Sequence, residues 1–159
     1  MADTARPAHA GVYLPPPLWY AVGLAVGLAI GRWRPLPMTA AGSPARTAAA
    51  VAGAVAFAAL ALGAVATFRR ARTTVVPNRP AAALVTGGPY LLTRNPMYLG
   101  LAALYVAVAA LANSWWPVVL LPLVVAVIDR RVIAREERYL AGAFPDEYAA
   151  YCARVRRWL

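Results

Sequence analysis

The sequence predicts an all-α integral membrane protein with about four transmembrane helices, the last two forming a tight helical hairpin, plus a cytoplasmic connector and a C-terminal helix. The first observation is compositional: 62% of the 159 residues are hydrophobic and 14% are charged, whereas soluble domains carry about 25% charged residues. The second observation is that three tracts, residues 10–31, 47–68 and 95–128, contain no charge at all. Because a membrane span needs about 20 such residues, these tracts predict membrane helices.

We expect one membrane domain over residues 1–159, with a tail over 1–17 and two N-terminal membrane helices within 18–68. The first helix is predicted over Leu18–Gly31, after three consecutive prolines, and the second over Thr47–Phe68, before a cluster of arginines. Three glycines of the first helix, spaced four apart, fall on one face. This spacing permits close helix packing, in this chain or in a dimer, although glycine is also common in membrane helices generally. The glycines are Gly23, Gly27 and Gly31.

The third part of the domain, residues 73–159, holds the connector, the hairpin and the C-terminal helices. The connector over 73–94 is rich in proline and glycine, so it cannot be one regular element, and a connector of this length is usually functional or disordered. Its apolar residues argue against disorder. The uncharged tract 95–128 is too long for one span, with Asn113 and Ser114 near its middle. We therefore expect a hairpin of Pro96–Ala112 and Trp115–Ile128; a re-entrant hairpin that does not cross the membrane is the alternative.

The last membrane helix should continue into water as far as Leu140, because no strong helix breaker intervenes, and a final amphipathic helix is expected over Asp146–Trp158. All sixteen basic residues are arginines. Four passes with both ends in the cytoplasm place thirteen of them inside and three outside, as the positive-inside rule favours. The arginine and alanine usage suggests a GC-rich bacterial genome, so the expected location is the bacterial inner membrane, with the active site facing the cytoplasm.

The residue types that several kinds of functional site require are scarce in this chain. The chain has one histidine, His9, and one cysteine, Cys152, which rules out an internal disulfide and leaves no ligand set for a zinc site. No metal is therefore expected, and a Ser-His or Cys-His catalytic pair has no credible members. The net charge of +10 would suggest nucleic acid in a soluble protein, but here the arginines flank membrane segments, so no nucleic-acid partner is expected. The N-terminus shows no signal-peptide pattern.

Residues that could do chemistry gather at three places. Asn95-Pro96 is a favoured helix start, whose free N–H groups can bind a carboxylate or phosphate, with Arg94 adding positive charge and Tyr90 and Tyr98 adding aromatic faces. The alternative is an ordinary capped helix with interfacial anchors. Glu136-Glu137 can bind an ammonium or a ribose, or can form ion pairs on a solvated face. The segment from Phe144 to Trp158 can lie on the membrane as an amphipathic helix, or act as a lid.

Together these motifs resemble the isoprenylcysteine carboxyl methyltransferases and the related phospholipid methyltransferases. The resemblance rests on Gly-Pro-Tyr at 88–90, Arg-Asn-Pro-x-Tyr-x-Gly at 94–100, Glu-Glu-x-x-Leu at 136–140 and Phe-x-x-Glu-Tyr-x-x-Tyr at 144–151. It covers roughly residues 74–157, including Thr74 and Pro77. Many relatives have His in place of Asn95, Pro145 replaces a usual glycine, and the chain ends in Trp158-Leu159 instead of the common proline.

The resemblance implies a membrane enzyme that uses S-adenosyl-L-methionine, releases S-adenosyl-L-homocysteine and has its catalytic core in residues 73–159. Carried over by motif, the expected cofactor-binding residues are Tyr90, Arg94, Asn95, Pro96, Tyr98, Leu99, Glu136, Glu137, Tyr148 and Tyr151. Glu137 is also expected to act in catalysis. Arg154 is expected to join it by orienting an anionic acceptor.

The expected acceptor is a lipophilic small molecule or lipid, such as an isoprenylcysteine-type carboxylate, in contact with membrane lipids; O-, N- and S-methylation all stay open. An NADPH-dependent sterol-reductase-like enzyme is one alternative, although Met97 and Leu101 depart from its pattern. A small four-helix membrane transporter is another, weakened by the lack of a carboxylate in the uncharged tracts. The glycine face of the first helix would permit a dimer without implying one.

Overall fold

The computed structural model describes residues 14–40, 42–72 and 83–159, and every regular element in these ranges is helical. This confirms the all-α prediction. Two short elements, a 3₁₀ turn η1 (Gly88–Leu91) and a π-helical turn η2 (Asp129–Ile133), accompany the longer helices. The longer helices are α1 (Pro16–Trp33), α2 (Pro44–Arg70), α3 (Pro96–Leu111), α4 (Trp115–Ile128), α5 (Ala134–Ala143) and α6 (Pro145–Arg154).

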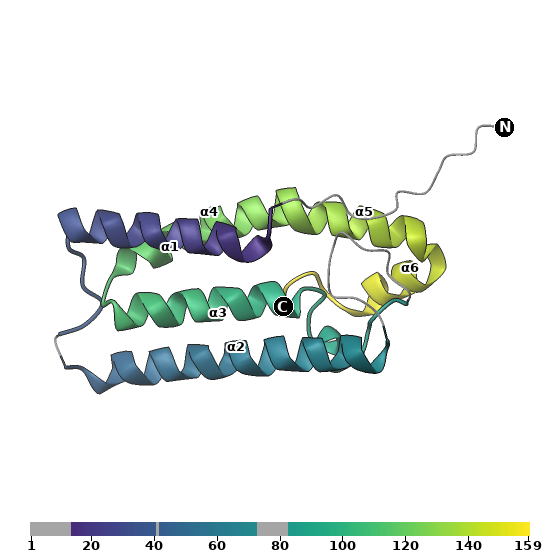
Figure 1. The fold of residues 1–159 in the computed structure, drawn as a ribbon, viewed down its shortest axis with the longest axis horizontal. Helices are drawn as coiled ribbons and strands as arrows, with labels where there is room; N and C mark the ends of the chain where they lie inside the picture. Colours follow the sequence, from purple (N-terminus) through teal and green to yellow (C-terminus); the bar gives the residue numbers. More distant parts are fainter. Residues whose placement is uncertain (1–13, 41, 73–82) are drawn as a thin grey trace.

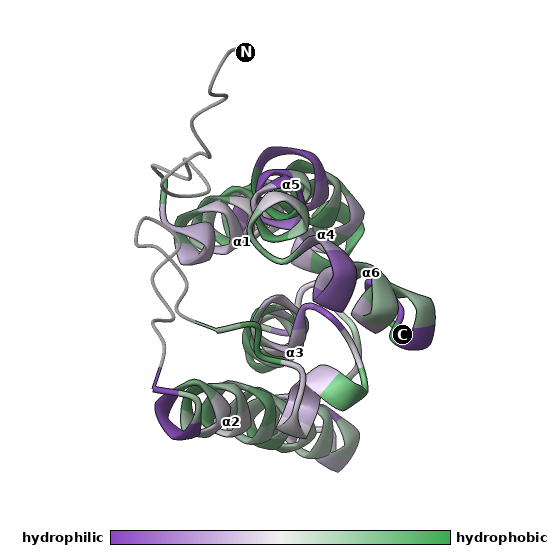
Figure 2. Ribbon diagram, turned by 90° about the vertical axis from the view of Figure 1, so that its right-hand side faces the viewer, coloured by the Kyte–Doolittle hydropathy of each residue, from purple (hydrophilic) through white to green (hydrophobic). Residues whose placement is uncertain are grey.

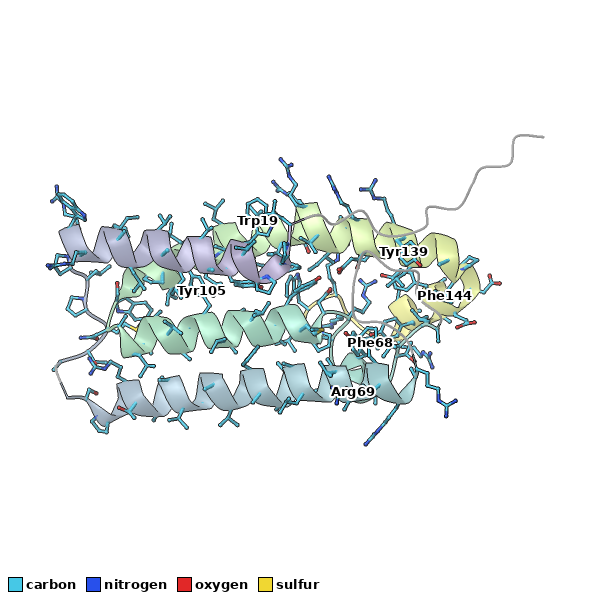
Figure 3. All side chains as sticks on the ribbon, viewed as in Figure 1. Trp19, Phe68, Arg69, Tyr105, Tyr139 and Phe144 are labelled. Atoms are coloured by element: carbon cyan, nitrogen blue, oxygen red, sulfur yellow. The ribbon has the colours of Figure 1, made fainter. Side chains whose placement is uncertain are left out.

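Helix α3 lies at the centre of the bundle (Figure 1). Helix α2 packs along one side of α3, while α1 and α4 pack on each other and on the other side. The rod formed by α4, η2 and α5 runs past the end of α3, and α6 folds back beside it. The core between α1, α3 and the rod contains Tyr20, Tyr105 and Ile128, and Tyr105 is visible between α1 and α3 in Figure 3.

The glycine face of α1 is used inside the chain. A Cβ atom added at Gly27 would lie 2.6 Å from Cα of Pro117, and one added at Gly31 would lie 2.7 Å from Oγ of Ser114. A Cβ added at Gly23 would collide with the side chain of Val124. These glycines therefore let α1 approach α4 closely, and the face that would permit a dimer is already covered by α4.

Helix α2 touches α3 through another small residue, Gly53, where an added Cβ would lie 2.7 Å from the carbonyl oxygen of Ala103. Most of the remaining surface of α2 is exposed, including Val51, Val55 and Leu62. Within the described ranges, α2 is the helix that is long and apolar enough to cross a membrane by itself, and α3 is a shorter apolar helix. An apolar helix that the protein leaves uncovered fits a lipid environment.

The turn between α3 and α4 is tied to the loop between α1 and α2. Asn113, which has a positive φ of 52°, accepts hydrogen bonds from the backbone N–H groups of Met38 and Thr39 and donates one to the carbonyl of Thr39. The indole of Trp116 donates to the carbonyl of Arg34. The predicted hairpin break at Asn113 and Ser114 is therefore confirmed, and it fixes the end of the bundle opposite α6.

Two features of the C-terminal half differ from expectation. The rod from α4 does continue beyond Leu140, to Ala143, but the π-helical turn interrupts it at Asp129–Ile133. The last helix ends at Arg154 instead of Trp158, because Val155 adopts an extended backbone and buries its side chain. The tail beyond Arg154 is then free to cross to the start of α3. Thr74, Pro77, His9 and residues 1–13 of the expected N-terminal tail lie outside the described residues, whereas Pro16 and Pro17, also expected in that tail, already belong to α1.

Hydrophilic residues gather at one end of the bundle, on α5, α6 and the end of α2 (Figure 2). The start of α3 reaches this same end. The three predicted clusters are therefore brought together at the polar end of an otherwise apolar bundle.

Candidate active site

The 3₁₀ turn η1 positions Tyr90 beside the end of α2. Gly88 has a positive φ of 59°, and a Cβ atom there would lie 2.5 Å from Oγ1 of Thr67, so glycine is required by both conformation and space. Pro89 follows it and fixes the turn. The ring of Tyr90 then meets the edge of Phe68, with ring centroids 5.7 Å apart; Phe68 is labelled in Figure 3. Burial raises the pKa of the Tyr90 phenol, so its hydroxyl stays protonated.

Asn95 stands at the N-cap position of α3, as predicted, but its side chain makes no capping hydrogen bond. Its Nδ2 instead donates to the carbonyl of Arg157 at 2.9 Å. Pro96 is the first helical residue and is buried. The first-turn N–H groups of α3 are thus left without a side-chain cap, which keeps the positive end of the helix available to an anion.

Glu136 and Tyr98 join α5 to the first turn of α3. The Tyr98 hydroxyl donates to Oε1 of Glu136 at 2.7 Å. Burial raises the pKa of the Glu136 carboxyl to about 7; the Tyr98 hydrogen bond opposes this rise and the charge of Glu137 adds to it. A carboxyl with such a pKa exchanges its proton near neutral pH, so a cationic ligand can draw it into its charged form.

Glu137, the next residue, has a different environment. Its carboxylate contacts Arg94 at 3.4 Å and accepts two hydrogen bonds from the guanidinium of Arg157, the one from Nε at 3.1 Å. Arg157 also reaches Oδ2 of Asp129 at 3.1 Å. Two guanidinium groups and two carboxylates therefore balance each other in this ionic network, which is formed by Arg94, Asp129, Glu137 and Arg157.

Two polar groups of the site are only partly satisfied by the residues that the structure describes. The Nε atom of Arg94 is buried and has no hydrogen-bond acceptor, although its Nη1 reaches Glu137 and donates to Sγ of Cys152. Glu136 faces a tyrosine hydroxyl, and within residues 14–40, 42–72 and 83–159 no salt bridge joins it to a cation. A buried donor and an unpaired carboxylate, close to an uncapped helix start, form a site for a ligand that carries both charges.

Helix α6 and the residue that follows it close the site from the side: Tyr148 and Tyr151 of the helix are buried, and so is Val155 in the extended tail. The Tyr151 hydroxyl donates to the carbonyl of Tyr90 at 2.7 Å, and burial raises the pKa of Tyr151 to about 12. The pKa of the Tyr148 phenol is raised as well, mainly by burial and next by the charge of Glu137. Both tyrosines therefore act as neutral packing and hydrogen-bonding groups beside η1.

The structure brings most of the predicted residues together. The carried-over set, from Tyr90 to Leu99, the two glutamates and the two tyrosines of α6, lies around the start of α3, α5 and α6. Arg154 is outside this cluster: it is exposed, and its Nε donates to the carbonyl of Ala150 in its own helix. Its expected role in orienting an acceptor stays a prediction.

Sequence reasoning missed Thr93, Asp129 and Arg157. Thr93 is fully buried, and its hydroxyl donates to the carbonyl of Arg157 at 3.0 Å. Arg157 was one of several C-terminal arginines with no spacing that set it apart, because its contacts depend on an extended tail. Asp129 was visible as an isolated acid after a long uncharged tract, and that isolation is the signal that could have drawn attention to it.

The fold and site thus define a small protein whose described part is an apolar helical bundle with an ionic cluster at one end. The family model for phospholipid methyltransferases matches residues 45–147, which is more than half of the chain, and the chain belongs to that family. The resemblance seen in the motifs is thereby confirmed. Members of the family are membrane methyltransferases that use S-adenosylmethionine.

Two curated relatives are similar over shorter ranges. The cobalt-zinc-cadmium resistance protein CzcN of Cupriavidus metallidurans is 37% identical over 80 residues, 50% of this chain and 37% of the relative. An uncharacterized protein of Haemophilus influenzae is 44% identical over 66 residues, 40% of this chain and the whole of the relative. The match therefore spans little more than a third of CzcN. No solved structure matches the chain.

Proposed function

We propose that this protein is an S-adenosylmethionine-dependent methyltransferase of the bacterial inner membrane that methylates a lipophilic acceptor. The observation that carries the proposal is the carboxyl group of Glu136, which Tyr98 holds at the polar end of the bundle and which forms no salt bridge with an arginine of the described ranges. Membership of the phospholipid methyltransferase family supports the same conclusion. The product would be S-adenosylhomocysteine.

The unpartnered groups of the site fit the amino-acid end of this cofactor. Glu136 is the group for its ammonium, because the charge of Glu137 is already balanced by two arginines. The buried Nε of Arg94 and the uncapped start of α3 are the groups for its carboxylate. Tyr90 and Tyr98 offer aromatic surface to the remainder. The sequence left open whether Glu136 or Glu137 holds the ammonium or the ribose of the cofactor, and we propose Glu136 for the ammonium.

The chemistry expected of the protein is modest. The bound cofactor supplies an electrophilic methyl group on a sulfonium, and displacement by the acceptor requires no protein nucleophile. The residues of the site have to hold the cofactor in one orientation and keep water away from it. Tyr148, Tyr151 and Val155 serve the second purpose, because their buried face closes the side of the site next to η1. In this proposal Glu137 holds Arg94 in position. Glu137 therefore has a supporting role, in place of the catalytic role that the sequence led us to expect.

We place helices α1 to α4 across the membrane, with the polar end in the cytoplasm. The exposed apolar surface of α2 then faces lipid, and an acceptor dissolved in the bilayer can approach the start of α3 sideways. An isoprenylcysteine-type carboxylate, an amine headgroup or another small lipid fits such a route. An anionic acceptor would meet Arg154, which is exposed on α6 at the membrane surface.

The test combines binding and turnover in the purified full-length protein. Isothermal titration with S-adenosylhomocysteine is expected to give saturable binding, and Glu136→Gln is expected to weaken it about tenfold to a hundredfold, because the lost contact is a charge-assisted hydrogen bond of about 1.5–3 kcal/mol. Incubation of membranes with methyl-labelled S-adenosylmethionine and a lipid extract of the host should give a labelled lipid, which identifies the acceptor.

Glu147→Gln is the matched control, since Glu147 is an exposed acid on α6 and lies outside the cluster. It should bind S-adenosylhomocysteine as the wild type does. A wild-type protein that binds no cofactor, or that binds a reduced nicotinamide in its place, contradicts the proposed function. Equal affinities of Glu136→Gln and Glu147→Gln contradict the role given to Glu136.

A further inference from the structure

The extended tail after α6 joins two parts of the site that are far apart in sequence. The backbone N–H of Arg94 donates to the carbonyl of Arg156 at 2.9 Å, and the carbonyl of Arg157 accepts from both Thr93 and Asn95. The tail backbone is therefore fixed on the loop that begins α3. This loop carries Arg94 and leads directly to Tyr98.

The side chain of Arg157 extends the connection to the rod. It binds both oxygens of Asp129, at 3.3 and 3.1 Å, and both oxygens of Glu137. Asp129 lies in the π-helical turn and Glu137 in α5, so the guanidinium spans the place where the rod changes its helical geometry. One residue thus ties the start of α3, through its backbone, to the rod, through its side chain.

The two parts joined in this way carry the two halves of the proposed cofactor contact. Tyr98 belongs to α3 and Glu136 to α5, and their hydrogen bond spans the same gap. The charge of Arg157 also acts on this pair, because it neutralises Glu137 next to Glu136. Among the described residues, Glu136 interacts electrostatically with Tyr98 from α3, Tyr90 from η1 and Glu137 from its own helix.

We propose that Arg157 is a positioning residue: it holds Glu136 opposite Tyr98 and takes up the charge of Glu137, so that Glu136 remains the acid that binds the cofactor's cation. This inference rests on the proposed function. If it holds, loss of Arg157 changes cofactor affinity and the pH dependence of binding. Without the guanidinium, the negative charge of Glu137 and Asp129 acts on Glu136, which then ionises at a higher pH.

The experiment measures S-adenosylhomocysteine binding by the purified full-length protein from pH 6 to pH 8. Arg157→Met is expected to bind about fivefold or more weakly at pH 7, since a rise of one pKa unit from about 7 lowers the ionised fraction of Glu136 at that pH by about this factor. Its affinity should recover toward that of the wild type as the pH rises to 8. Arg157→Lys, which keeps a charge but cannot bind two carboxylates bidentately, should lie between them.

Arg138→Met is the matched control, because Arg138 is exposed on α5 and its Nε donates only within its own helix, to Ala134. It removes the same charge and should leave affinity and pH profile unchanged. A wild-type protein without binding contradicts the proposed function itself. Wild-type binding together with Arg157→Met that matches Arg138→Met at every pH contradicts the inference alone. If Arg157→Met does not fold, Arg157→Lys serves as the test. An Arg157→Lys protein with the affinity and the pH profile of the wild type then overturns the inference.

Discussion

At the scale of single residues, the decisive contrast is between two adjacent glutamates. Glu137 is neutralised by Arg94 and Arg157, whereas Glu136 meets the hydroxyl of Tyr98. Adjacent residues on a helix point about 100° apart, so neighbours in sequence can have different partners. A paired carboxylate supports structure, and an unpaired one with a raised pKa is available to a ligand.

This contrast predicts proton release on cofactor binding. Burial places the pKa of Glu136 at about 7, so near pH 7 part of the protein carries the neutral acid. A bound cation favours the carboxylate, which lowers that pKa and releases about half a proton per cofactor at pH 7. The release should vanish above pH 8.5, where Glu136 is already ionised, and increase below pH 7.

Calorimetric titrations of S-adenosylhomocysteine in buffers with different ionisation enthalpies measure this quantity. In Glu136→Gln the measured enthalpy should become independent of the buffer. Buffer-independent binding by the wild type at pH 7 would contradict the protonation state given to Glu136.

At the scale of elements, close packing depends on small residues in α1 and on the hydrogen bonds at the far turn. The glycines of α1 remove side-chain bulk where α4 approaches, and van der Waals packing is a main source of helix association in lipid. At the end of the bundle, the side-chain amide of Asn113 forms hydrogen bonds that join the α3–α4 turn to the α1–α2 loop. The two pairs of helices are thus joined by packing along their length and by hydrogen bonds at their end.

Gly27→Ala is expected to destabilise the protein by about 1–3 kcal/mol, because its Cβ would lie 2.6 Å from the backbone of Pro117 and α4 would have to move. Thermal unfolding of the detergent-solubilised protein measures the effect. Gly142→Ala is the control: it lies in α5, a Cβ there has nothing within 4 Å, and alanine should be neutral or slightly stabilising. Equal stability of the two variants would show that α1 and α4 are not packed tightly at Gly27.

At the scale of the whole molecule, the helices are largely apolar, and hydrophilic residues gather at the end that faces the viewer in Figure 2. The apolar helices suit the bilayer, and the arginines of the polar end suit the cytoplasmic surface. Under the proposed function, a soluble cofactor and a lipid acceptor meet where these two environments adjoin, and we place the start of α3 at that boundary.

This orientation predicts opposite accessibility for the two ends. In a Cys152→Ala background, a cysteine at Ala40, in the α1–α2 loop, should react with a membrane-impermeant maleimide added to intact cells after outer-membrane permeabilisation. A cysteine at the exposed Arg138 should react only once the inner membrane is opened. The reverse pattern would invert the proposed topology, and early labelling of both would contradict a spanning bundle.

Much of the fold could be predicted from sequence because it depends on local patterns. Uncharged tracts define the helices, Asn95-Pro96 starts α3, and Asn113-Ser114 separates α3 from α4. The bounds of α4 agree with the prediction at both residues, whereas α2 is longer by a few residues at each end. The end of α6 could not be predicted, because its last residues leave the helix for a tertiary contact with residues 93–95.

The sequence alone determined that the chain is helical, apolar along its helices and equipped with acids and tyrosines next to its uncharged tracts, since hydrophobicity and helix starts are properties of neighbouring residues. Only the tertiary structure decided which acid is paired, which arginine enters the network and what the glycines of α1 pack against. Those outcomes depend on charges and surfaces that come together from distant positions, such as Asp129 and Arg157, whose meeting no local pattern encodes.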